Sequence, residues 1–106
     1  MPAPIEIDVA TAARHFQAGA LLLDVREPAE VATVAIPGSV HLPSREIPAR
    51  FAEIPANRPV LVLCHHGGRS ARVTQFLRAN GLDNVTNVAG GIDAWARQVD
   101  RSLPRY

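Results

Sequence analysis

The chain has one cysteine, Cys64, and it begins the run CHHGGRS at residues 64–70. An apolar segment at 60–63 precedes this run, and apolar residues at helical spacing follow it. This order predicts a strand, a glycine-bearing turn and a helix, which puts Cys64 at the carboxyl edge of a sheet, where α/β proteins keep their ligands. The turn amides and the helix N-terminus stabilise negative charge. We therefore expect a nucleophilic thiolate, whereas most free cysteines are small buried apolar residues.

The residues after the cysteine fit the same chemistry. The backbone amides of residues 65–70 are the candidate cradle for the sulfur, and Gly67 and Gly68 allow the positive φ angles that aim successive N–H groups inward. Arg69 would add a permanent positive charge that braces the loop or meets an anionic donor. Ser70 stands where the N-cap of the following helix is expected.

The adjacent pair His65 and His66 has two interpretations. As metal ligands they would need further partners, but no cysteine or carboxylate pair lies near them in the sequence, and we expect adjacent loop side chains to diverge. We therefore predict loop-lining histidines that supply charge or donors near the sulfur, with no metal site and no cofactor.

A second polar group follows the apolar run at 21–23. Asp24, Arg26 and Glu30 come after the carboxyl end of this predicted strand, so we expect them at the same sheet edge as the cysteine loop. We interpret them as an ion-pair network that supports the loop, with Asp24 pairing with either Arg69 or Arg26. Arg45 is a weaker candidate for contact with an anion.

Short apolar runs alternate with helical patterns along the rest of the chain. We expect strands at 5–7, 21–23, 40–42, 60–63 and 85–88, and helices at 9–18 after an Asp8 N-cap, 28–32, 44–53, 70–80 and from 90 onward. Pro48 leaves the start of the third of these helices open between 44 and 49. Uninterrupted apolar strands are typical of a parallel sheet covered on both faces. The order of elements therefore predicts an α/β fold with a mainly parallel sheet.

Composition sets the broad class. With 106 residues, 47% hydrophobic and 20% charged, the chain suits a single domain over 1–106. The net charge of +1 indicates no nucleic-acid surface, and no apolar stretch reaches the roughly 20 residues that span a bilayer. The first residues lack the pattern of a secretory leader, and one cysteine makes no internal disulfide. These features favour a cytoplasmic protein.

Four blocks of sequence resemble a known family. They are DVREPAE at 24–30, IPGSVHLP at 36–43, CHHGGRS at 64–70 and GGIDAW at 90–95. In this order, from about Ile5 to Trp95, they are similar to a single-domain rhodanese of the rhodanese-like sulfurtransferase family. Two positions depart from the family pattern, Ala35 where a histidine is common and residues 97–100 where a glycine is common. Both positions are expected to be structural.

The resemblance implies a five-stranded, mainly parallel sheet flanked by helices on both faces. It also implies a catalytic Cys64 that carries sulfur as a persulfide from a donor such as thiosulfate to an acceptor, cyanide in an assay or a thiol in the cell. Partners would be small sulfur donors and acceptors, with a protein sulfur acceptor left open. We expect no nucleic-acid or membrane partner, and a monomer.

Two other functions compete with this one. Cysteine-dependent phosphatases and arsenate reductases also use an anion loop, but phosphatase loops of this type place arginine six positions after the cysteine, whereas Arg69 follows Cys64 by five. A non-enzymatic binding module is the second alternative, although such relatives typically lose the cysteine. A sulfur carrier dedicated to one protein partner is a variant of that alternative.

Overall fold

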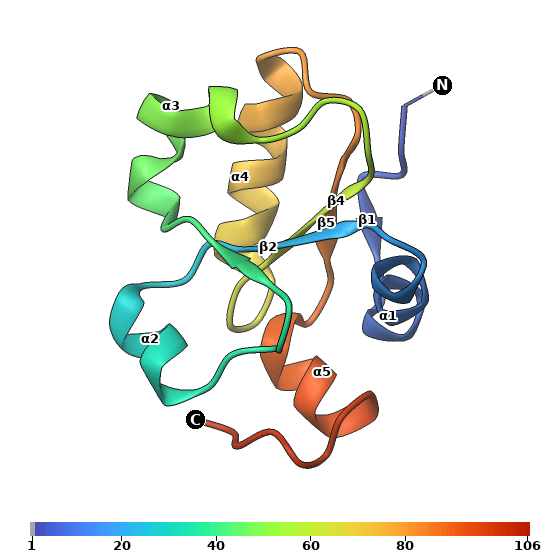
Figure 1. Cartoon of the computed structure of the whole chain (residues 1–106), viewed down its shortest axis with the longest axis vertical. Helices are drawn as coiled ribbons and strands as arrows, with labels where there is room; N and C mark the ends of the chain where they lie inside the picture. Colours follow the sequence, from blue (N-terminus) through green and yellow to red (C-terminus); the bar gives the residue numbers. More distant parts are fainter. Residues whose placement is uncertain (1) are drawn as a thin grey trace.

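The computed structural model of the chain describes residues 2–106, so Met1, the first residue of the segment compared with a leader, lies outside it. Five parallel strands form one sheet in the order β1-β5-β4-β2-β3 (Figure 1). Their bounds are β1 Glu6–Ile7, β2 Leu21–Asp24, β3 Val40–His41, β4 Val60–Leu63 and β5 Val85–Val88. The predicted five-stranded α/β sheet is confirmed, and every observed pairing is parallel.

Helices cover both faces of this sheet (Figure 1). The bounds are α1 Val9–Gln17, α2 Pro28–Thr33, α3 Ile47–Arg50, α4 Gly68–Ala79 and α5 Gly91–Gln98. Buried residues of α1 and α5 pack on one face, and those of α3 and α4 pack on the other. Among the described residues, no helix has the length and apolar character needed to cross a bilayer.

The central strand β4 divides its side chains between the two faces. Leu61 and Leu63 enter the core under α1 and α5, whereas Val60, Val62 and Cys64 enter the core under α3 and α4. This alternation follows from the two-residue repeat of a strand. Because both faces are covered, all four residues of β4 are buried and the strand is apolar throughout.

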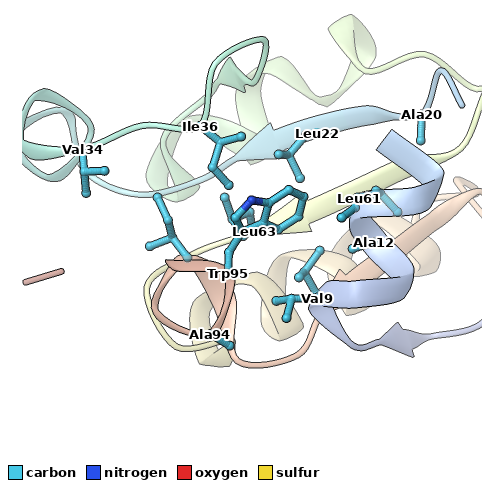
Figure 2. Packing of buried hydrophobic residues seen from close by; sticks show 13 residues of the cluster. Val9, Ala12, Ala20, Leu22, Val34, Ile36, Leu61, Leu63, Ala94 and Trp95 are labelled. Carbon is cyan, nitrogen blue, oxygen red and sulfur yellow. The ribbon is translucent and has the colours of Figure 1, made fainter. Parts of the chain in front are cut away.

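Trp95 lies in the core under α1 and α5, as its neighbours in Figure 2 show. The side chain is only 4% exposed, and its ring meets the Phe16 ring edge-on with centroids 6.3 Å apart. Such an edge-to-face pair adds to the apolar burial of the two rings. Trp95 is therefore a packing residue that fixes α5, and with it the start of that helix, against the sheet.

One local expectation holds and another is wrong. The Asp8 carboxylate accepts the Thr11 amide at 2.8 Å and caps α1, as its position before the apolar pattern predicted. The single helix expected at 44–53 is instead α3 between two 3-10 turns, Ser44–Glu46 and Phe51–Glu53. Pro48 has no N–H to donate to the Ser44 carbonyl, so a continuous α-helix cannot form there.

Candidate active site

Cys64 directly follows β4 and turns its sulfur toward the start of α4. Its Sγ accepts a hydrogen bond from the Gly67 amide at 3.1 Å and another from the Ser70 hydroxyl at 3.2 Å. The residue is 1% exposed. Two donors aimed at one buried sulfur favour a negative charge on that atom, because fixed dipoles are most effective where water is excluded.

The turn differs in detail from the sequence expectation. Gly67 has φ of +107° and is the N-cap of α4, whereas Gly68 is already the first helical residue and has no positive φ. Ser70 is therefore the third residue of the helix and not its N-cap. Since the helix starts earlier than predicted, Ser70 lies inside the first turn, where its hydroxyl reaches the sulfur. Of the described amides at 65–70, only that of Gly67 donates to Sγ.

The beginning of α5 supports the loop from the other side. The Ile92 amide donates to the Cys64 carbonyl at 2.8 Å, and the Asp93 amide donates to the His65 carbonyl at 3.1 Å. Gly91, with φ of +60°, lies so close that a Cβ there would stand 2.4 Å from the Cys64 carbonyl oxygen. Only glycine permits both this approach and this backbone angle.

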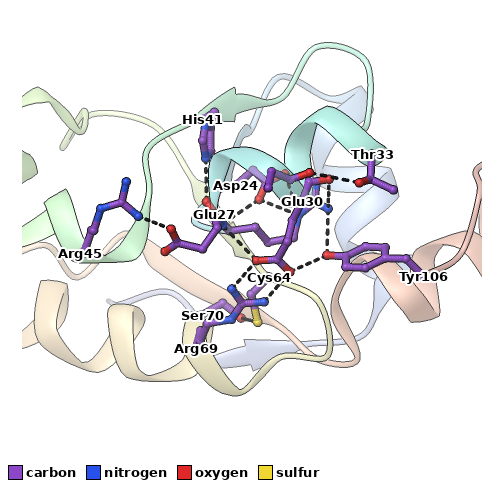
Figure 3. Close-up of polar contacts among 12 residues, drawn as sticks. Asp24, Glu27, Glu30, Thr33, His41, Arg45, Cys64, Arg69, Ser70 and Tyr106 are labelled. Atoms are coloured by element: carbon purple, nitrogen blue, oxygen red, sulfur yellow. Dashed lines mark hydrogen bonds and ion pairs between the residues drawn. The ribbon is translucent and has the colours of Figure 1, made fainter.

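Arg69 forms a two-pronged pair with Glu30 of α2 (Figure 3). The nitrogens Nη1 and Nη2 lie 2.6 and 2.9 Å from the two carboxylate oxygens, the geometry in which arginine binds carboxylate most firmly. The bond from Arg69 lowers the pKa of Glu30 to about 2 and raises the pKa of Arg69. This pair joins α2 to the first turn of α4 beside Cys64.

Asp24 and Arg26 form a second, buried pair. The Arg26 Nη2 lies 2.6 Å from the Asp24 carboxylate, and neither residue is exposed. Of the two partners considered for Asp24, the structure selects Arg26, while Arg69 pairs with Glu30. The Arg26 Nη2 also donates to the Val34 carbonyl at 2.7 Å, which holds the end of α2. The three residues predicted as a supporting network do form one beside the loop.

Other polar residues lie farther from the sulfur. Arg45 pairs with Glu27, and both side chains are exposed, so the arginine is engaged on the surface (Figure 3). The His41 Nε2 lies 2.7 Å from the Arg26 carbonyl oxygen and joins β3 to the same network.

Tyr106 is a site residue that sequence reasoning missed. Its hydroxyl donates to Glu30 at 2.7 Å and accepts from Arg26 at 3.0 Å, and its ring stacks on His65 with centroids 3.9 Å apart. No local pattern marks this residue, because its partners lie 76 and 80 positions earlier in the chain. Only the path of the chain after α5 brings it to the loop.

A sequence profile of the rhodanese-like domain matches residues 8–98, nearly the whole chain. This chain belongs to the rhodanese-like family. The resemblance that rested on four blocks of sequence is thereby confirmed.

Individual rhodanese-like relatives agree with this assignment. A curated sulfurtransferase of Allochromatium vinosum is 46% identical over 77 residues, which cover 73% of this chain and 72% of that protein. The crystal structure of a rhodanese-related protein from Thermoplasma volcanium is 33% identical with a TM-score of 0.82, covering 89% of this chain and 92% of that one. A human single-domain sulfurtransferase is 25% identical with a TM-score of 0.77, covering 89% and 96%.

The two loop histidines of this rhodanese-like chain converge, so the expectation that they diverge was wrong. Their ring centroids are 3.9 Å apart, and with Asp93 they place one candidate ligand atom each within 4.8 Å of one another. The Asp93 carboxylate already accepts from Arg97 at 3.2 Å and from Arg105 at 3.0 Å. Because two guanidinium groups face that carboxylate, the electrostatics disfavour a divalent cation there.

Proposed function

We propose that this chain is a sulfurtransferase that carries sulfane sulfur as a persulfide on Cys64, from a donor such as thiosulfate to a thiophilic acceptor. The observation that carries the proposal is the Cys64 sulfur held by the Gly67 amide and the Ser70 hydroxyl. Membership of the rhodanese-like family and the sulfurtransferase names of two relatives support the reaction class.

The proposed reaction has two displacements at sulfur. The Cys64 thiolate attacks the outer sulfur of thiosulfate, a new S–S bond forms, and the old S–S bond breaks with its electron pair leaving on sulfite. An acceptor such as cyanide then attacks the outer persulfide sulfur, which leaves as thiocyanate and returns the thiolate. No metal, cofactor or external oxidant enters this balance.

The loop would assist both steps by stabilising negative charge. The Gly67 amide and the Ser70 hydroxyl donate to the thiolate before attack and remain close to the persulfide afterwards. Arg69 supplies a guanidinium beside the loop that can meet the sulfonate oxygens of thiosulfate. The arginine follows the cysteine by five positions, which favours a single sulfur atom over a phosphate group as the occupant of the loop.

The proposal includes the partners and the compartment. The donor and acceptor are small molecules, a thiol or a protein thiol serves as acceptor in the cell, and the chain acts as a monomer. We place the protein in the cytoplasm, because a lone catalytic thiol works best where cellular reductants keep it free of disulfides.

The test is the intact mass of the protein before and after thiosulfate, and again after cyanide. We expect wild type to gain about 32 Da with thiosulfate and to lose it with cyanide as thiocyanate appears, while Cys64→Ser gains nothing. If the mass rises only with an organic persulfide, sulfur transfer stands and the donor is an organic persulfide in place of thiosulfate. No gain with either donor would contradict sulfur transfer and favour a binding module.

A further inference from the structure

The segment after α5 returns to the catalytic loop and is held there at several points. Leu103 packs against the core under α1 and α5, and the Arg105 Nε donates to Asp93 at 3.0 Å. These contacts bring Tyr106 to Glu30, with the phenol ring toward the site (Figure 3). The ring is parallel to His65 within 5°. Tyr106 is thus placed by the contacts of the residues just before it and by its own contacts with Glu30 and His65.

The Glu30 carboxylate is fully occupied by donors. Oε1 accepts from Arg69 at 2.6 Å and from the Glu27 amide at 3.0 Å, while Oε2 accepts from Arg69 at 2.9 Å and from Tyr106 at 2.7 Å. A carboxylate offers about four lone-pair sites, so no site is left over. Tyr106 supplies the one donor that comes from neither α4 nor the N-cap of α2.

Arg69 is held by this carboxylate and yet keeps donors to spare. Each terminal nitrogen uses one N–H on Glu30. The Nε–H and the second N–H of each terminal nitrogen have no acceptor among residues 2–106. A guanidinium that is fixed on one edge and free on the others can present a constant set of donors to an anion.

The hydroxyl of Tyr106 must keep its proton to play this part. Burial raises the pKa of Tyr106 above its usual value, so the phenol stays neutral and donating throughout the physiological range. Its oxygen also accepts from the Arg26 Nη1 at 3.0 Å, which orients the proton toward Glu30.

We propose that Tyr106 is a positioning residue for anionic sulfur donors: its hydroxyl fixes Glu30, and Glu30 fixes the guanidinium of Arg69 that meets the donor. Tyr106 acts through these two residues and does not touch the reacting sulfur. The inference rests on the proposed function for its role, although one of its tests needs no sulfur transfer.

The first test compares Tyr106→Phe with wild type. This change removes the hydroxyl and keeps the ring that stacks on His65. The rate at which Cys64 gains sulfur is followed by intact mass over a range of thiosulfate concentrations. We expect the half-saturating concentration to rise about threefold to tenfold in Tyr106→Phe, with the maximal rate within about twofold, because only a bond to a charged group is lost.

The matched control is Ser102→Ala, which removes a hydroxyl from the same segment. That hydroxyl donates to Asp100 and contacts neither Glu30 nor Arg69. We expect its half-saturating concentration to equal that of wild type. An unchanged value in Tyr106→Phe, or an equal rise in Ser102→Ala, overturns the proposal. Tyr106→Leu also removes the stacked ring; a rise confined to Tyr106→Leu would assign the effect to the ring and contradict a role of the hydroxyl.

The second test detects the orientation of the Arg69 guanidinium without a sulfur-transfer reaction. Cys64 is alkylated with negatively charged iodoacetate and with neutral iodoacetamide, each forming a C–S bond and releasing iodide. We expect the ratio of the iodoacetate rate to the iodoacetamide rate to fall about threefold or more in Tyr106→Phe, since Arg69 no longer meets the anion in a fixed orientation. An unchanged ratio contradicts the proposal. If neither thiosulfate nor an organic persulfide loads wild type, the proposed function fails while this ratio still decides the role of Tyr106.

Discussion

The Ser70 hydroxyl donates a hydrogen bond to the Cys64 sulfur over 3.2 Å, across a turn that separates them by six residues. Both groups are buried, so this bond is not exchanged for one with water. The same helix carries the partner of Glu30, Arg69, one residue earlier. The first turn of α4 therefore supplies both a donor to the sulfur and a cation beside it.

Replacement of Ser70 by alanine should slow the loading of Cys64 by thiosulfate. A hydrogen bond to a charged atom contributes about 1.5–3 kcal/mol, which corresponds to a rate about 10- to 100-fold lower. The measurement is the rate of mass gain at saturating thiosulfate. Ser39→Ala is the control, because that hydroxyl donates to the Ile36 carbonyl away from the site and its loss should leave the rate unchanged.

Gly91→Ala should destabilise the protein and disturb the loop. A Cβ at this position would overlap the Cys64 and His65 carbonyls at 2.4 and 2.5 Å. We expect the free energy of unfolding to fall by at least about 2 kcal/mol in urea titrations. Gly81→Ala is the matched control: Gly81 also has a positive φ, but nothing lies within 4 Å of its Cβ position. Equal losses in the two variants would contradict a role for the close approach.

Glu30→Gln should lower stability in a pH-dependent way. The pKa of Glu30 is about 2 in the folded protein against an ordinary value of 4.5. Because the folded-state pKa is depressed, the stabilisation is present above about pH 4.5 and is lost as the pH falls toward 2. We expect a deficit of about 1–3 kcal/mol at pH 7 that shrinks between pH 4.5 and 3 in urea titrations.

An exposed acid provides the comparison for that pH series. The Asp83 side chain makes no hydrogen bond or ion pair among the described residues, so Asp83→Asn should show no deficit at any of these pH values. A Glu30→Gln deficit that stays constant from pH 7 to 3 would mean that the charge of Glu30 does not produce the stabilisation.

Asp24→Ala should be among the most destabilising single changes in the chain. It would leave the guanidinium of Arg26 buried without its carboxylate, and the loss of one partner of a buried pair costs about 3–5 kcal/mol. Urea titration measures the loss. Glu53→Gln breaks an ion pair with Arg50 on the surface, where both side chains are well exposed, and should leave the midpoint unchanged.

The strands and the location of the site were predictable because they depend on local patterns. The apolar runs at 21–23 and 60–63 form most of β2 and all of β4, and the carboxyl ends of these strands bring the Asp24 and Cys64 regions to one edge. Strands covered on both faces are typically near-continuous apolar runs, which the sequence shows directly. The buried strand β5 is less apolar, and its Thr86 and Asn87 side chains donate hydrogen bonds to Pro4 and Glu6.

The predictions made from the sequence were wrong where a single residue changes the local backbone geometry. Pro48 prevents a continuous helix over 44–53. Gly67 has a left-handed backbone and lets α4 begin at Gly68, so Ser70 lies inside the first turn of the helix, where its hydroxyl donates to the Cys64 sulfur. The convergence of His65 and His66 depends on backbone angles and on packing with Tyr106, and none of these is encoded by their neighbours in the sequence.

The sequence by itself determined the fold family and singled out the candidate nucleophile and its loop, because these features reside in contiguous residues whose types and order suffice. Tertiary structure decided which acid meets which base. Asp24 pairs with Arg26 and Glu30 pairs with Arg69. Tyr106, at the far end of the described chain, donates a hydrogen bond to Glu30. Ion pairs and hydrogen bonds form only within about 3 Å, and such distances between remote segments are set by the packing of the whole core.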